Sequence, residues 1–142
     1  MLEQATAIFT ELGKRWEATN AEIGVAYALI ADGEDEPARP ILEGALRTAV
    51  DLQSLGLAAD ALVAVASVRV QTDPGAAARL LSAAWTIGEE GGHPLVSRST
   101  GLASETAERR ARERLGERFE QEWEAGSDLT LEEAVELALD EE

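Results

Sequence analysis

The chain lacks cysteine altogether, and it has one histidine and one lysine among its 142 residues. Without cysteine there are no disulfides, thiolate metal sites or cysteine nucleophiles, and one histidine leaves little scope for imidazole catalysis or metal ligation. Long apolar runs are also missing, because the longest falls far short of the roughly 20 residues that a membrane-spanning helix needs. We therefore expect no metal, no cofactor and no membrane partner.

Acidic side chains dominate the charge. The chain has 28 of them against 12 basic ones, a formal net charge of −16. This excess opposes attraction to nucleic-acid backbones and to anionic lipid, so we expect neither as a partner. A hydrophobic content of 45% is nevertheless too high for a disordered tail. The first 13 residues have neither a basic start nor a continuous apolar stretch, which predicts a cytoplasmic protein.

Apolar residues recur at three- and four-residue spacing almost throughout, and alternation typical of strands is scarce, so the pattern predicts an all-α fold. Glycine and proline divide the chain into about eight helical segments with short loops, which favour antiparallel neighbours. The expected breaks are near Gly13, Asp32–Gly33, Leu55–Gly56, Asp73–Pro74, Gly91–Pro94, Gly116 and Gly126.

Two helix starts carry recognisable chemistry. Asp73 can cap a helix whose first residue is Pro74. Thr130 followed by Glu133 forms a capping-box pattern before an apolar segment. These two boundaries are predicted from side-chain capping chemistry as well as from the positions of glycine and proline.

A degenerate internal repeat occupies residues 1–94. A small residue is followed four places later by a large apolar one, and three places later by another apolar or small one, at intervals of 33 and 39 residues. The three occurrences are Ala5/Phe9/Leu12, Ala38/Leu42/Ala45 and Ala77/Leu81/Ala84. This pattern resembles the second helix of tetratricopeptide repeats, which have a period near 34 residues. Such a loose pattern can also arise in another alanine-rich helical bundle.

The first repeat looks incomplete, because the helix that should precede Ala5 would lie before Met1. We therefore expect either the C-terminal part of a longer array or a short protein whose first helix is unpaired. In both cases part of the first helix face, at Ile8, Phe9 and Leu12, would be uncovered. Two copies of one apolar patch can meet about a two-fold axis, so this face predicts a homodimer.

The last part of the chain resembles a known family. The similar segments are Ala77–Ala84, Glu108–Gly116, Phe119, Trp123, Gly126 and Leu129–Val135. They are similar to the C-terminal end of actinobacterial LuxR and antibiotic-regulatory-protein-type ATPase regulators, in which a tetratricopeptide-like array follows an ATPase. The resemblance implies a helical sensor and protein-interaction array, and it lends no catalytic residue to any position.

Neither the ATPase nor the DNA-binding part of those regulators is expected in this chain. The one lysine, Lys14, has no phosphate-binding glycine pattern before it, and the last helix, Leu131–Leu139, is acidic. Residues 95–142 are expected to be capping helices of the same domain, with Phe119 and Trp123 meeting the final helix. A solenoid needs such a cap with a polar outer face. The predicted architecture is therefore a short stack of antiparallel helical hairpins with a C-terminal helical cap.

No constellation of a nucleophile and a base can be assembled, so no catalytic residue is assigned and the chain is not expected to be an enzyme. His93 lies in a turn-like Gly-Gly-His-Pro segment, and the carboxylates at Asp32–Glu36 and Glu89–Glu90 are typical of solvated loops. The arginines of residues 108–118 alternate with glutamates, which favours ion pairs on a solvent-facing helix over phosphate binding.

Three residues are the candidates for partner contact. Tyr27 and Arg69 fall on first helices, which line the concave face of tetratricopeptide arrays, and Trp16 is a further aromatic candidate. Arg69 either extends to solvent or binds an anionic group in that groove. The predicted function is a non-catalytic protein-interaction or regulatory domain that binds a partner protein or its own upstream domains. The alternative is a sensor that holds a small-molecule effector near Tyr27, Val65 and Arg69.

Overall fold

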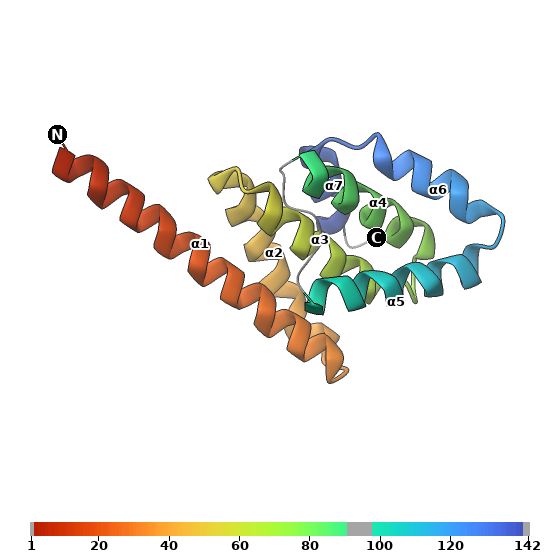
Figure 1. The fold of residues 1–142 in the computed structure, drawn as a ribbon. Coiled ribbons are helices and arrows are strands. Elements are labelled where there is room, and N and C mark those ends of the chain that lie inside the picture. Colours follow the sequence, from red (N-terminus) through yellow and green to blue (C-terminus); the bar gives the residue numbers. More distant parts are fainter. Residues whose placement is uncertain (1, 91–97, 141–142) are drawn as a thin grey trace.

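A computed structural model describes residues 2–90 and 98–140, with side chains over 11–90 and 101–140. These residues form seven helices and no strand, so the prediction of an all-α fold is confirmed (Figure 1). The helices are α1 (Leu2–Ala31), α2 (Asp35–Leu52), α3 (Leu55–Arg69), α4 (Pro74–Glu90), α5 (Arg98–Leu115), α6 (Arg118–Ser127) and α7 (Leu131–Leu139). None of them combines the length and apolarity that crossing a bilayer requires.

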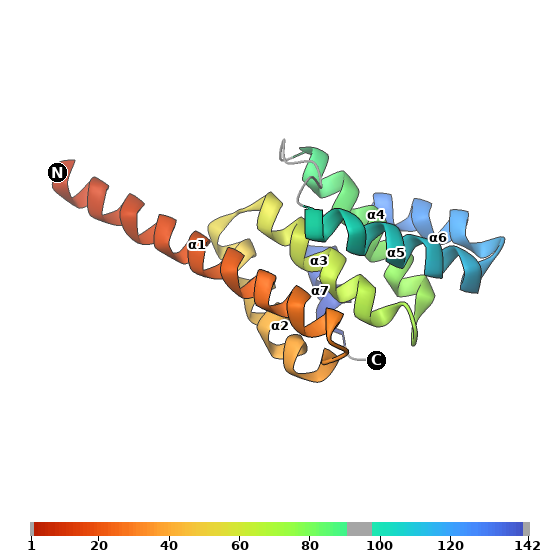
Figure 2. The ribbon, with the colours of Figure 1, turned by 60° about the horizontal axis from the view of Figure 1, so that its bottom comes forward.

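The break predicted at Gly13 is wrong, because α1 continues through Gly13 and Gly24 as one helix of 30 residues. A glycine inside a helix costs only about 1 kcal/mol, and residues on both sides favour the helical state. Consequently Ala5, which was assigned to a second helix, and Tyr27, which was assigned to a first helix, belong to the same helix. The N-terminal half of this helix extends well beyond the rest of the molecule (Figures 1 and 2).

Helices α1 and α2 pack as one hairpin, and α3 and α4 pack as a second. The first hairpin turns at Gly33, which has a left-handed φ of 79°, close to the predicted break. The predicted break at Leu55–Gly56 falls two residues earlier, where Gln53 is left-handed and the Ser54 hydroxyl accepts a hydrogen bond from the Leu57 amide. A side-chain cap therefore decided this boundary, not the glycine.

Helix α3 lies at the centre, as its nearly continuous apolar sequence predicts. It packs against α1 and α5, against both hairpin helices α2 and α4, and against α7. Its buried residues join a hydrophobic cluster that draws on α1 to α7, from Ile23 to Ala138. The two side-chain caps predicted from sequence are also present. Asp73 Oδ1 accepts from the Ala76 amide, and Thr130 and Glu133 form the reciprocal capping box.

Helices α5 and α7 pack on both α3 and α4, and α6 packs on α4. Phe119 on α6 is buried, with Trp123 5.5 Å away between ring centroids and the Arg112 guanidinium 4.2 Å from its ring. Helix α7 packs chiefly on α4, α3 and α2. Its buried residues belong to the same hydrophobic cluster as Phe119, against which Trp123 also packs, and direct contact of these two rings with α7 stays a prediction. The loop before α7 places this helix beside Arg69 of α3. The Arg69 guanidinium donates hydrogen bonds to carbonyl oxygens at the C-terminus of α7.

The break predicted near Gly126 is confirmed, because α6 ends one residue later at Ser127, although Gly126 itself is helical. Its role is close packing of α6 on α4. A Cβ atom at this position would lie 2.3 Å from the carbonyl oxygen of Arg79 and 2.6 Å from its Cα. Only glycine allows the two backbones to approach so closely. The neighbouring ion pair, from Arg79 Nε to Glu122 Oε2 at 2.7 Å, joins the same two helices.

The substitution Gly126→Ala should therefore lower the free energy of unfolding by about 1–3 kcal/mol, because the added methyl group must push α6 away from the α4 backbone. Gly44→Ala is the matched control, since a Cβ there would meet nothing within 4 Å and the change removes a helical glycine. The control should gain up to about 1 kcal/mol. Urea denaturation of both variants measures the difference, and equal effects would contradict the packing role of Gly126.

Candidate functional site

An open groove lies between α1 and α5, with α3 at its floor, and has a volume of about 540 Å³. Tyr27 is positioned there because its hydroxyl donates a 2.7 Å hydrogen bond to the carbonyl oxygen of Asp60 on α3. The groove is lined by Gly24, Tyr27, Ala28, Ile30, Ala31, Ser67, Leu102, Ala103, Thr106, Ala107 and Arg110. Most of these residues are small or apolar, so the groove can accommodate an apolar ligand.

Small side chains keep the groove open. At Gly24 even a Cβ atom would find nothing within 4 Å, and α1 and α5 contact α3 rather than pack extensively on each other. Ser67 at the floor donates its hydroxyl to the Ala64 carbonyl at 2.7 Å, so it presents little unsatisfied polarity. Leu102 on one wall is 58% exposed, an unusual fraction for a large apolar residue beside a groove.

Arg110 is the charged residue in the lining of the groove. Among the described residues no hydrogen bond or ion pair to its guanidinium is found, whereas Arg112 on the same helix pairs with Glu108 and Glu120. None of the residues that line the groove carries a carboxylate. A ligand with an apolar body and an acidic group near Arg110 therefore fits the groove best.

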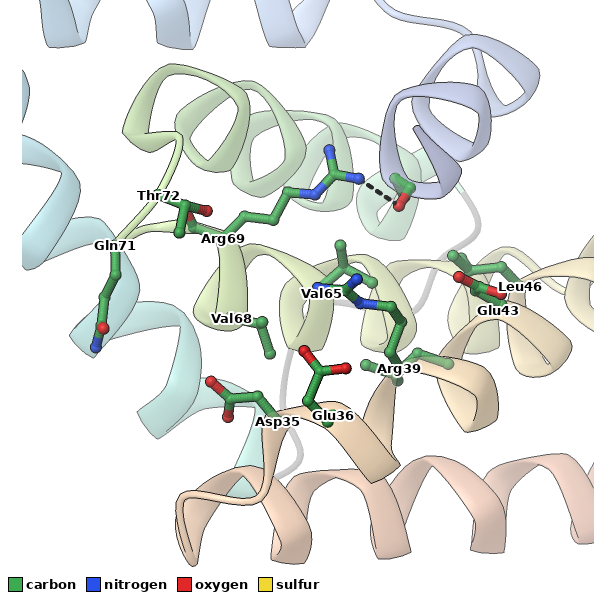
Figure 3. Close-up of a pocket in the computed structure, with 12 residues that line it drawn as sticks. Asp35, Glu36, Arg39, Glu43, Leu46, Val65, Val68, Arg69, Gln71 and Thr72 are labelled. Atoms are coloured by element: carbon green, nitrogen blue, oxygen red, sulfur yellow. Dashed lines mark hydrogen bonds between the residues drawn. The ribbon is translucent and has the colours of Figure 1, made fainter. Parts of the chain in front are cut away.

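A second, smaller cavity of about 250 Å³ lies between α2, α3 and α7. Figure 3 shows the Arg39 guanidinium extending from α2 toward Val65 on α3, with the carboxylates of Asp35 and Glu36 on the same side as Arg39. Its lining residues are Asp35, Glu36, Arg39, Leu42, Glu43, Leu46, Val65, Val68, Arg69, Gln71, Thr72 and Ala138. The cavity therefore combines an apolar floor with charges of both signs.

Arg69 borders this second cavity and not the groove of Tyr27, so the expectation that both residues line one concave face is wrong. Its Nη1 donates to the Leu137 carbonyl at 2.7 Å and its Nη2 to the Ala138 carbonyl at 3.0 Å. These oxygens are at the C-terminus of α7, where the helix dipole favours a cation. Arg69 thus acts as a tether for α7, and the predicted effector site near Tyr27, Val65 and Arg69 is divided between two cavities.

Trp16 lies apart from both cavities, in the middle of α1. Its indole Nε1 donates to the Ser54 hydroxyl at 3.2 Å, where α1 crosses the turn between α2 and α3. The side chain is 43% exposed, and Leu12 one turn earlier is 40% exposed. The side chains of Ile8 and Phe9, the other residues predicted for self-association, lie outside the described residues.

Sequence reasoning missed Arg39 and Leu102, because neither residue differs in type or spacing from the other residues of an ordinary amphipathic helix. The arginine-rich stretch on α5 faces solvent as predicted, with an ion pair of 3.9 Å between Arg112 and Glu108 four residues apart. His93 lies outside the described residues. Within the described ranges no group of three or more histidine, aspartate or glutamate side chains is arranged to hold a metal ion.

Comparison with known proteins gives no match: no family model, no curated protein and no solved structure is similar enough to this chain.

The tether predicts different effects for the two arginines that border the second cavity. Arg69→Met should lower the free energy of unfolding by about 1–2 kcal/mol, because the terminal carbonyls of α7 lose two charged donors. Arg39→Met should change it by less than about 0.5 kcal/mol, since no partner of Arg39 is found among the described residues. Hydrogen exchange of the α7 amides measures the local effect, and unaltered protection in Arg69→Met would show that α7 is held by other contacts.

Proposed function

We propose that the chain is a non-catalytic protein-interaction domain, the C-terminal part or a small relative of a bacterial signal-transduction regulator acting in the cytoplasm. The observation that carries this proposal is the carboxylate-free apolar groove between α1 and α5. Its tetratricopeptide-like character is supported by the two hairpins, α1–α2 and α3–α4, and by the arrangement of α1, α3 and α5 around one groove. First helices occupy that position in tetratricopeptide arrays, as the resemblance implies.

The partner that fits best is an amphipathic helix. A helix packs into a groove between two others when small residues let the backbones come close, and Gly24, Ala28 and Ala103 provide that room. Tyr27 and Leu102 supply larger apolar contact area at the walls. An acidic residue near one end of the partner helix would meet Arg110, which gives the complex a fixed direction.

A display library of 16-residue peptides tests this proposal. The selected peptides should have apolar residues at three- and four-residue spacing and an acid near one end, and Ala28→Arg should weaken their binding by about tenfold or more. Ala28 is exposed, so the substitution fills the groove without disturbing the core. Ala21→Arg, at an exposed position of the same helix outside the groove lining, is the matched control and should bind as the parent does. Peptides that bind both variants equally well, or no enrichment at all, would contradict a helix-binding groove.

A second candidate function, sensing of a small effector, is favoured by the orientation of Arg39. Its guanidinium lies beside Val65 of α3 in the cavity (Figure 3), whose lining also includes Leu42 and Leu46. A small amphipathic carboxylate could ion-pair with this guanidinium while its apolar part covers the floor. The carboxylates of Asp35 and Glu36 would favour a ligand that also carries an amino group.

Thermal denaturation with short-chain carboxylic acids and apolar amino acids tests this second function. A ligand that binds only the folded chain should raise the melting temperature in proportion to the logarithm of its concentration. The increase should disappear in Arg39→Met and persist in Arg47→Met, an exposed arginine of α2 outside the cavity lining. The same increase in both variants, or no increase with any compound of these classes, would count against the effector site.

A further inference from the structure

Helix α7 is held on α2, α3 and α4 by a small contact surface. It has nine residues, and a helix of that length is not stable on its own in water, so its helical state depends on docking. Its buried residues are Ala134, Val135 and Ala138, and two of these are alanines that remove little apolar area from water. A segment with so few buried contacts opens locally at a lower free energy than the core does.

The second cavity lies between this helix and the α2–α3 hairpin partners that it covers. Ala138 is the residue of α7 in the cavity lining, and Leu42, Leu46 and Val65 contribute apolar walls from α2 and α3. The volume of about 250 Å³ leaves space between these walls. Atoms placed in this space would contact α2, α3 and α7 together, and each such contact would strengthen the docking of α7.

Arg69 connects the cavity to α7 by hydrogen bonds. It belongs to the cavity lining, and its Nη1 and Nη2 atoms donate to the Leu137 and Ala138 carbonyl oxygens. A guanidinium has five N–H donors, and these two hydrogen bonds use two of them. A carboxylate that accepts from the other donors would therefore be linked to the C-terminus of α7 through one planar cation.

We propose that a ligand in the second cavity holds α7 in its docked position, and that the empty cavity allows α7 to undock. This inference rests on the effector-sensing function proposed for the cavity and adds its regulation. An apolar amino acid has the matching chemistry, because its side chain would cover Val65 while its carboxylate reaches Arg39 or Arg69 (Figure 3). A ligand that contacts α7 binds the docked state better, and it therefore raises the population of that state.

Undocking would change the surface that the chain presents. Helix α7 packs on α2, α3 and α4, and its outer side carries the exposed carboxylates of Glu132, Glu133 and Glu136. When α7 leaves, the apolar residues that it covers on those helices come into contact with water. Occupancy of the cavity thus decides whether an acidic helix or an apolar face is presented on this side of α3.

Thiol modification measures the undocking of α7, because the chain has no cysteine of its own. The Val135→Cys variant places one thiol at a position that is 8% exposed, so a thiol reagent reaches it when α7 opens. In this background Ala138→Leu, which fills the cavity in place of a ligand, should slow the modification at least about threefold. Arg69→Met, which removes the two hydrogen bonds to α7, should accelerate it about tenfold.

Two controls make the comparison specific. Ala125→Leu, the same change at an exposed position of α6, should leave the modification rate unchanged. A thiol introduced by Val25→Cys, at a position 53% exposed on α1, should react at the same rate in every background. Ala138→Val adds a smaller side chain in case leucine overfills the cavity, and circular dichroism checks that each variant is folded. Modification that is no slower in either Ala138 variant would overturn the proposal.

L-Leucine is the probe that separates this inference from the function on which it rests. If millimolar L-leucine raises the melting temperature and slows modification of the Val135→Cys variant, both are supported. A raised melting temperature with unchanged modification would overturn the control of α7 and leave the effector site standing. An unchanged melting temperature would count against the effector site, whereas slower modification in Ala138→Leu would still support docking of α7 by filling of the cavity.

Discussion

Helix α3 has no polar face, and the arrangement of the other helices follows from the need to cover it. Eight of its residues from Leu57 to Ala66 are buried, and no single partner helix can shield a cylinder on all sides. The hairpin partner α4 covers one side, α1 and α2 cover another, and α5 and α7 close the remainder. The groove and the second cavity occur where this cover is incomplete, on different sides of α3 at Ser67 and at Val65. The candidate sites are thus consequences of how five helices surround a sixth.

Alanine and glycine decide how closely the surrounding helices approach. Small residues dominate the contact between α3 and α4, and the backbone of α6 reaches the Arg79 carbonyl of α4 because Gly126 has no Cβ. Close backbones increase dispersion contacts between neighbours without requiring large side chains, which suits a chain with 4% aromatic residues. Where small residues face no neighbour, as at Gly24 and Ala28, the same composition leaves a hollow. One compositional bias therefore produces both the tight core and the open groove.

Much of the fold could be predicted from local chemistry, and the exceptions have physical causes. The caps at Asp73 and Thr130 depend on residues three apart, so the sequence alone predicted them. Glycine proved ambiguous: Gly33 and Gly116 take left-handed φ values of 79° and 57° and end helices, whereas Gly13 and Gly126 stay helical. That choice depends on what packs against each glycine, which spacing does not reveal.

The candidate site was predicted less well, because its residues are defined by contacts between distant segments. Arg69 was marked as the one cation of an apolar helix, yet its partners are carbonyls 68 and 69 residues later in the sequence. Tyr27 was assigned to a concave face shared with Arg69, but it lines a different groove, and the Asp60 carbonyl that accepts its hydroxyl hydrogen lies 33 residues away. Arg39 gave no signal, because an exposed arginine on an amphipathic helix is ordinary until α3 and α7 enclose the space before it.

The excess of acidic charge also limits where this chain can make contacts. Copies with a net charge of −16 repel one another, as does any acidic partner, unless the meeting surfaces are free of carboxylates or carry a cation. The described lining of the groove has Arg110 as its charged residue. The second cavity differs, since Asp35, Glu36 and Glu43 share it with two arginines. Charge therefore separates the two places: the lining of the groove has no carboxylate, whereas the second cavity has charges of both signs.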